Sequence, residues 1–143
     1  MTWADTVALQ SLIESVPVLD GKVFVSEAKF APPDENTKVT APYAVIHAAL
    51  GRDVRENTTG PTLVQNPRFT IHFVGVNANQ ALVVADLVKD VLVPGGQGVR
   101  VSVAGRTNDP LWWSSPIPGQ IDSSVVPAVA YQVAEVGWKS QPA

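Results

Sequence analysis

The pattern of apolar and polar positions is most regular in the middle of the chain. Residues 68–76 are rich in β-branched and aromatic side chains, and polar residues occupy every second position over half of this stretch, as in a sheet strand. Asn77 and Asn79 are good helix N-cap residues, and apolar residues then recur at helical spacing over residues 81–92. A proline and two glycines at 94–96 end the helix. The pattern predicts a strand followed directly by a helix, a unit that needs a sheet to pack on.

The predicted helix has one apolar face and two apolar residues outside it. The apolar face comprises Ala81, Val84, Leu87, Val88, Val91 and Leu92. Leu82 and Val83 instead flank the polar face that carries Asp86. Both would be half exposed in a monomer, which makes them candidate subunit contacts.

A second helix is predicted at the start of the chain, over residues 2–16. Its core face comprises Ala8, Leu9, Leu12, Ile13 and Val16, and Pro17 ends it. Trp3 and Val7 lie on the other side of this helix. Trp3 either covers the start of the helix or contacts a partner, and the sequence leaves both possibilities open.

Strand-like segments and long loops fill the rest of the chain. Strands are predicted at residues 22–28, 42–50, 98–105 and 128–139, and loops at 30–40, 51–66 and 106–127. The resulting order is α-β-β-β-α-β-β. Strands joined by hairpin-length loops pair antiparallel, so we predict an α+β fold with a mostly antiparallel sheet of about five strands and two helices packed on one face.

The loop at residues 51–66 combines charges of both signs. Arg52, Asp53, Arg55 and Glu56 lie within five positions of one another. The loop is either a solvated hairpin tip or a segment that forms ion pairs with a neighbouring copy. Its length favours a functional role.

The loop at residues 106–127 contains two adjacent tryptophans. Trp112 and Trp113 stand between Pro110 and Pro116. Adjacent side chains cannot both point the same way, so one tryptophan can pack inward while the other covers something else. Both are candidate contacts with another subunit.

Composition limits the possible classes of protein. A chain of 143 residues predicts one domain, residues 1–143, and 45% hydrophobic with only 16% charged residues indicates a globular protein whose surface is partly covered by partners. The net charge of −3, without a Lys/Arg cluster, argues against a nucleic-acid-binding surface. No cysteine is available for disulfides or thiolate chemistry. No signal peptide or membrane-spanning run is recognised, so we expect synthesis in a cytoplasm.

No residue set predicts catalysis. His47 and His72 each lie within a predicted strand, where a histidine is more often a packed side chain than a ligand, and no acidic motif accompanies them. The Gly-rich segment at 94–98 follows a helix instead of preceding one and lacks the Lys-Ser/Thr of a phosphate loop. We therefore expect no enzymatic activity, no cofactor and no metal.

Several segments together resemble a known family. They are residues 42–47 (PYAVIH), 50–61 (LGRDVRENTTGP), 66–70 (NPRFT) with the following helix, 103–106 (VAGR), 112–118 (WWSSPIP) and 131–138 (YQVAEVGW). Their order and composition resemble those of the tail terminator proteins of long-tailed bacteriophages, especially phages that infect actinobacteria. The resemblance extends over nearly the whole chain.

The resemblance implies a ring, usually of six copies, at the head-proximal end of the virion tail. Such a ring caps the tail tube, ends its polymerisation and docks the head-tail connector protein, while DNA passes through the lumen without specific binding. The parts are assembled in the host cytoplasm. Six copies at −3 each would carry −18, which disfavours adhesion of the channel to phosphates.

A cyclic ring joins two different surfaces of each copy. The candidate contact residues for the ring and its partners are Trp3, Arg52, Asp53, Arg55, Glu56, Leu82, Val83, Trp112 and Trp113. Two alternatives remain. One is another neck component, either a head-completion or connector protein or a tail tube subunit. The other is a small α+β ligand-binding domain that uses the few polar strand residues, His47, His72 and Tyr43.

Overall fold

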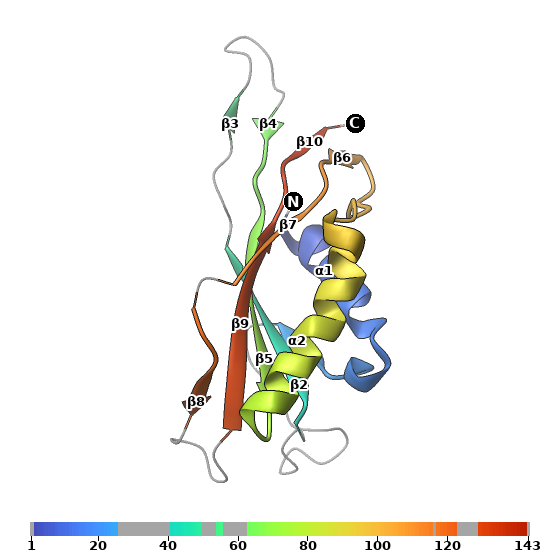
Figure 1. Cartoon of the computed structure of the whole chain (residues 1–143). Coiled ribbons are helices and arrows are strands. Elements are labelled where there is room, and N and C mark those ends of the chain that lie inside the picture. Colours follow the sequence, from blue (N-terminus) through green and yellow to red (C-terminus); the bar gives the residue numbers. More distant parts are fainter. Residues whose placement is uncertain are drawn as a thin grey trace.

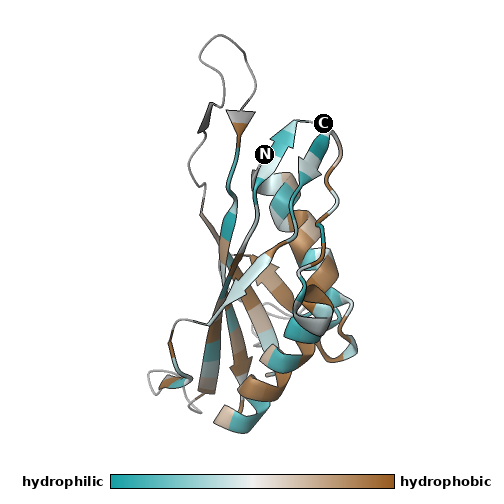
Figure 2. Cartoon of the chain, turned by 45° about the horizontal axis from the view of Figure 1, so that its top comes forward, coloured by the Kyte–Doolittle hydropathy of each residue, from teal (hydrophilic) through white to brown (hydrophobic). Residues whose placement is uncertain are grey.

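The computed structural model describes residues 2–25, 41–49, 54–55, 63–115, 117–122 and 129–142 of the chain. Two helices lie on one face of a sheet whose strands are mostly antiparallel (Figure 1). This arrangement confirms the predicted α+β class and the placement of the helices. Figure 2 shows that the central strands and the helices carry most of the hydrophobic residues, whereas the strands beside the C-terminus are hydrophilic.

The first helix, α1 (Thr2–Glu14), agrees with the prediction and is followed by a short 3-10 turn, η1 (Pro17–Leu19). Leu9, Ile13 and Val16, all on the predicted face, are buried in the core. The spacing of these apolar residues thus fixes which side of α1 meets the sheet.

The main sheet has the order β1-β2-β5-β9-β7, and β8 also pairs with β9. Its strands are β1 (Val23–Val25), β2 (Tyr43–Ala49), β5 (Arg68–Gly75), β7 (Trp112–Ser114), β8 (Gln120–Asp122) and β9 (Val129–Gly137). The β1–β2 pair is parallel, and the other pairs are antiparallel. The strand predicted at 42–50 corresponds to β2 and is internal, between β1 and β5.

Alternation along β5 separates the two faces of the sheet. Phe69, Ile71 and Phe73 are fully buried beneath the helices, whereas Thr70 and His72 point to the helix-free face and are half-buried. The registers with β2 and β9 extend these rows across the sheet. One face therefore forms the core, and the other carries the polar and aromatic residues discussed below.

The second helix, α2 (Ala78–Leu92), starts where the sequence predicts. The backbone N–H of Gln80 donates to the side chain of Asn77 at 2.8 Å, and the Gln80 side chain accepts from Val76 N–H at 2.8 Å. The first bond satisfies an N–H group that the first turn leaves without a helical partner, and the second ties the residue before the N-cap to the helix.

The predicted core face of α2 needs one correction. Ala81, Val84, Val88 and Leu92 are buried, together with Ala85, and Val91 is half-buried against the core. Leu87, however, is 42% exposed. It lies about 240° around the helix from Ala81, outside the buried stripe, which the small side chain of Ala85 completes.

The prediction of a strand at residues 98–105 is wrong. After η2 (Pro94–Gly96) the chain is extended but does not join a sheet: Val99 N–H donates to Leu92 O at 2.9 Å, and Val99 O accepts from Leu111 N–H at 3.0 Å. A side chain at Gly98 would overlap the Leu111 carbonyl. The alternating valines pack onto the core from this irregular segment.

The predicted loop at 106–127 and the residues after the last predicted strand are partly strands. The segment contains β6 (Arg106–Asn108), β7 and β8, and the C-terminal residues form β10 (Ser140–Pro142). The two tryptophans therefore belong to β7. Each of these strands is three residues long: β7 and β8 pair with β9, and β6 and β10 pair with each other.

Two small two-stranded sheets, which we together call the second sheet, continue the first. Here β3 (Val54–Arg55) pairs with β4 (Leu63–Val64), β10 pairs with β6, and a bridge between Gln65 and Ser140 joins the two pairs. The order β3-β4-β10-β6 thus repeats β2-β5-β9-β7. Three described connections pass from one sheet to the other at the same level: β4 to β5 at Pro67, β6 to β7 at Pro110, and β9 to β10 at Trp138. We call this level the break. The second sheet lies beyond the upper end of the helices (Figure 1).

Candidate functional site

An exposed aromatic-and-charged cluster occupies the helix-free face of the main sheet. Trp112 is 41% exposed, and the guanidinium carbon of Arg68 lies 5.7 Å from the centre of its ring. Arg68 also approaches Glu135, with 3.7 Å between Nη2 and Oε2. A Cβ atom at Gly137 would lie 2.7 Å from the Trp112 ring, so only glycine lets the indole rest on β9. The cluster presents a flat, partly greasy surface that suits a protein contact.

Trp113 points to the opposite face. Its ring stacks on Phe73 with 6.1 Å between ring centres and an interplanar angle of 21°, and it packs against the buried core. This confirms the expectation that one of the two tryptophans packs inward. Trp113 is therefore part of the folded core, which leaves Trp112 as the more accessible of the two.

Two histidines and a tyrosine lie together on the helix-free face. The rings of His47 and His72 are 5.0 Å apart, edge to face, and Tyr131 lies 5.6 Å from His72. Burial lowers the pKa of His72 below its usual value, and the nearby His47 lowers it further. The lowered pKa favours the neutral form of His72, and the edge-to-face rings have the geometry of a structural aromatic contact.

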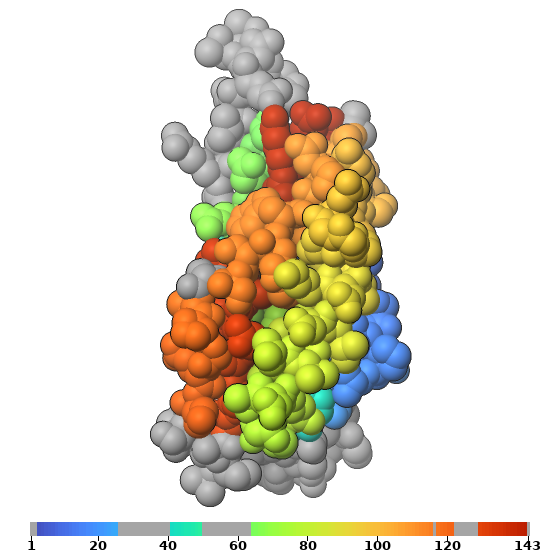
Figure 3. Space-filling model, in the orientation of Figure 1, coloured from blue at the N-terminus to red at the C-terminus, as the bar shows by residue number. Residues whose placement is uncertain are grey.

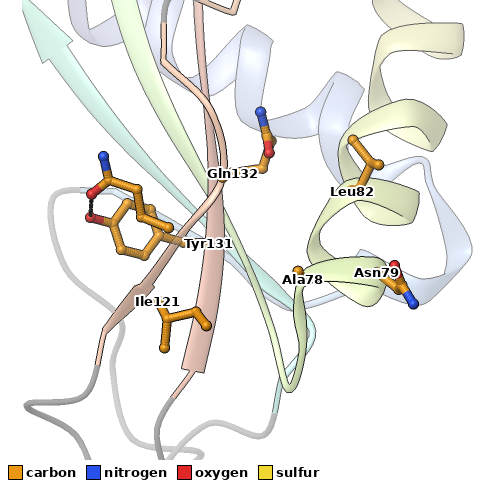
Figure 4. Close-up of a pocket in the computed structure, with 8 residues that line it drawn as sticks. Ala78, Asn79, Leu82, Ile121, Tyr131 and Gln132 are labelled. Carbon is orange, nitrogen blue, oxygen red and sulfur yellow. Dashed lines mark hydrogen bonds between the residues drawn. The ribbon is translucent and has the colours of Figure 1, made fainter.

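A hollow of about 620 Å³ opens between the start of α2 and β8, with β9 at its floor (Figure 3). Figure 4 shows Leu82 and Ala78 on the α2 side and Ile121 on the β8 side. Leu82 and Ile121 are large apolar residues that are 50% and 71% exposed. The sequence could not reveal this hollow, because its walls come from segments about forty residues apart.

Three of the polar side chains at the hollow, those of Gln120, Tyr131 and Gln132, already bond within the chain. The hydroxyl of Tyr131 donates to the Gln120 side chain at 2.8 Å, and Gln132 donates to the hydroxyl of Ser115 at 3.2 Å. Ser115 in turn donates to the Val133 carbonyl at 3.0 Å. The hollow is consequently better suited to an apolar surface than to a polar small molecule.

The other candidate contact residues fall into two groups. Trp3 is 64% exposed on α1 and Val83 is 55% exposed on α2, in agreement with the expectation that both lie outside the core. Arg52, Asp53 and Glu56 lie outside the described residues, and the backbone of Arg55 belongs to β3. The structure therefore brings Trp3, Leu82 and Val83 to the surface but does not test their contacts.

A buried polar cluster near the break was missed in the sequence. Asp5 and Ser140 are almost fully buried, and Arg106 Nε donates to Ser140 Oγ at 3.0 Å. Burial raises the pKa of Asp5, while the positive charges of the amino terminus and Arg106 partly oppose this shift. The Asn108 amide donates to the Val101 carbonyl at 2.6 Å. The Arg106–Ser140 bond joins β6 to β10, and the Asn108 bond fastens β6 to the 98–105 segment, so the cluster has a structural role.

The described residues contain no group of three or more His, Asp or Glu side chains that could hold a metal ion. Within the same residues, no helix is both long and apolar enough to cross a membrane. The features that remain are surfaces: the Trp112 cluster, the hollow, and the exposed apolar residues of both helices.

Comparison with known proteins gives a fold match. No protein-family model matches the chain, and no curated protein matches it. Among solved structures, the chain is similar to one from the "virion of native gene transfer agent (GTA) particle", with a TM-score of 0.53 and 13% identity, over 95% of this chain and 92% of that one. The two chains share a fold over almost their entire lengths.

Proposed function

We propose that this chain is a structural protein of a tailed phage or phage-like virion and that it acts as the tail terminator. In this role, six copies form a ring that caps the tail tube, ends its polymerisation and docks the head-tail connector. The observation that carries the proposal is the fold shared over 95% of the chain with a component of a gene transfer agent virion. The resemblance of the sequence to tail terminators supplies the specific role.

The surfaces of the subunit support a ring. A cyclic assembly needs two different contact surfaces on each copy. Exposed apolar residues occur on both sides of the helical layer, with Trp3 and Val7 on α1 and Leu82 on α2. The net charge of −3 per copy, without a basic cluster, is compatible with DNA passing through the lumen and not adhering to it.

Imaging of virions made without this protein tests the role. Loss of a tail terminator should give overlong tubes and heads without tails, because nothing stops tube growth. Loss of a connector or head-completion protein should give tails of normal length that stay unattached. Normal-length free tails would therefore overturn the terminator proposal and favour the other neck components.

A single substitution tests whether the apolar surface of α2 serves assembly. Leu82→Asp should leave folding unchanged, because the side chain is half exposed, but should block ring formation by placing a charge in an apolar contact. Asp90→Asn, an exposed change on the same helix, is the matched control and should assemble normally. Unchanged assembly of Leu82→Asp, measured by native mass spectrometry, would remove this residue from the interface.

A further inference from the structure

The two outer edges of the main sheet are complementary in direction. Because β1 runs parallel to β2 and every other pair is antiparallel, β1, β2 and β9 share one direction, whereas β5, β7 and β8 run the opposite way. Within the described residues, no strand pairs with the outer edge of β1 or of β8. If two copies stand side by side in the same orientation, β8 of one meets β1 of the next as an antiparallel pair.

The two edges also lie at nearly the same level of the sheet. Val23 of β1 is in the row of Ala44, Phe73 and Gln132, while Gln120 of β8 pairs with Tyr131, the next residue of β9. A small stagger between copies therefore brings the two edges opposite each other. Staggers of this kind are required whenever a sheet closes on itself.

The outer edge of β1 carries a backbone carbonyl that β2 does not use. Ala44 N–H donates to Lys22 O at 3.0 Å, so the neighbouring Val23 carbonyl points away from β2. The side chain of Gln10 donates to this carbonyl at 2.7 Å. In the free subunit this amide takes the place that the N–H of a further strand would occupy, so an added strand would exchange one hydrogen bond to this carbonyl for another.

We propose, on the basis of the ring proposed above, that the ring closes by strand addition, with β8 of each copy pairing with β1 of the next. The favoured register sets Ile121 opposite Val23 of the neighbour, because both positions belong to the helix face of the sheet. Lys22 and Asp122, residues of opposite charge, then stand at opposed positions. Opposite charges directly across an antiparallel pair are favourable.

The same contact fills the hollow beside α2. The residues Trp3, Val7 and Gln10 are spaced as one stripe of α1, and the bond from Gln10 to Val23 turns this stripe toward the β1 edge. When β8 of one copy pairs with β1 of the next, α1 of the next copy lies on the helix face beside α2 of the first. Its exposed apolar stripe then covers Leu82 and Ile121 at the hollow.

The dimensions suit the proposed ring. The path β1-β2-β5-β9-β8 is five strands wide, so six copies give thirty strands and, at about 4.8 Å per strand, a circumference of roughly 145 Å and a diameter of roughly 45 Å. With the helices outside, side chains on the inner face leave a passage of roughly 30 Å, which is wider than a DNA duplex. Six copies thus form one continuous closed sheet around an opening wide enough for a DNA duplex.

Disulfide trapping tests the strand pairing. The protein has no cysteine, so Lys22→Cys combined with Asp122→Cys can crosslink only at the introduced positions. Oxidation should give a ladder of covalent oligomers that ends in a closed species of six chains. The matched control, Lys22→Cys with Asp86→Cys, places the second cysteine on the exposed side of α2 and should give at least about tenfold less product, because these positions are not opposed.

Each other outcome overturns one proposal in particular. A six-copy ring of the wild-type protein without crosslinking would reject the strand pairing and keep the ring. An open ladder that never closes would reject the closed ring and keep the edge contact. Efficient dimers of Asp122→Cys alone would show two-fold pairing of β8 with itself and would reject the head-to-tail contact.

A charge exchange gives an independent readout. Lys22→Asp and Asp122→Lys should each weaken association by roughly five- to tenfold per contact, because like charges then oppose each other, and the double variant should regain wild-type association. Sedimentation velocity over a concentration series measures the effect. Single variants that associate as the wild type does would contradict the proposed register.

Discussion

At the scale of single residues, neighbours in the sequence have different tasks because strand geometry sends them to opposite faces. Trp113 stacks on Phe73 within the core, whereas Trp112 lies on Gly137 and is covered by Arg68 on the exposed face. Trp113 therefore contributes to the stability of the core, whereas Trp112 is available for contacts at the surface. Substitutions at the two positions should have different consequences.

Trp113→Ala should lower the free energy of unfolding by about 2–3 kcal/mol, somewhat less than for a fully buried tryptophan, because the side chain is half-buried on Phe73. Trp112→Ala should cost less than about 1 kcal/mol and should act on assembly instead. Urea unfolding of the two isolated variants measures the difference. Equal losses of stability would show that Trp112 is also structural.

The lowered pKa of His72 makes stability depend on pH. Because the pKa of His72 is lowered in the folded protein, its full contribution to stability is present above the unfolded value near 6.5. As the pH falls below that value, the unfolded chain binds a proton that the folded chain resists, and the free energy of unfolding decreases. The other titratable or charged groups described on the helix-free face with His72 are His47, Tyr43, Tyr131, Arg68 and Glu135.

His72→Gln should therefore flatten the decrease in unfolding free energy between about pH 6.5 and pH 5. The raised pKa values of Asp5 and Glu14 act in the opposite direction, since protonation of a buried carboxyl favours the folded state, and they cancel when the variant is compared with the wild type. Chemical unfolding at a series of pH values measures the slope. An unchanged slope would show that His72 does not titrate in this range.

At the scale of elements, local pattern predicts more than long-range pairing does. The cap at Asn77 and the buried stripe of α2 follow from spacing alone, as does the burial of β5 beneath the helices. The segment at 98–105 alternates like a strand, yet its backbone bonds to Leu92 and Leu111, which the local pattern does not encode. Strands β7 and β8 exist because β9 pairs with them, and three residues carry too little signal by themselves.

The candidate site was likewise predictable only where local spacing determines it. Exposure of Leu82, Val83 and Trp3 follows from helical periodicity, so the sequence identifies them correctly as surface residues. The hollow and the two sheet edges require knowledge of which strands are neighbours. The role of Gly137 in placing Trp112 likewise becomes visible only through the contact across β7 and β9.

The buried stripe of α2 gives a prediction at this scale. Val88→Asp should lower the free energy of unfolding by more than about 4 kcal/mol and prevent folding, because it buries an unpaired charge. Leu87→Asp, one residue earlier but 42% exposed, should cost less than about 1 kcal/mol. Circular dichroism and thermal unfolding distinguish the two. A soluble, folded Val88→Asp variant would show that the stripe is placed wrongly.

At the scale of the whole molecule, two sheets are joined through the break, and only the larger is covered by helices (Figure 1). The C-terminal strand β10 holds the smaller sheet together, since it pairs with β6 and bridges to Gln65. Trp138, which precedes it, stacks on Phe69 at 5.3 Å within the main core. The two sheets should therefore respond separately to changes at the C-terminus.

A chain that ends at Lys139 should keep the main sheet but lose about 2–3 kcal/mol of stability, because several backbone hydrogen bonds of β10 and the buried Ser140 are removed. Amides of Arg106–Asn108 should exchange hydrogen faster, whereas those of β5 and β9 should stay protected. Gln141→Ala, which keeps the strand, is the control. Loss of protection throughout the chain would show that the two sheets form one cooperative unit.

The break has a consequence for how such a protein can change over generations. Strands β5, β9 and β7 all end at the break, and the pairing of β4, β10 and β6 beyond it is separate from their alignment below it. The β3–β4 end can then gain or lose residues while the helix-covered half keeps its shape. Related proteins could therefore differ in the β3–β4 pair, and so contact different docking partners, while the helix-covered main sheet stays the same.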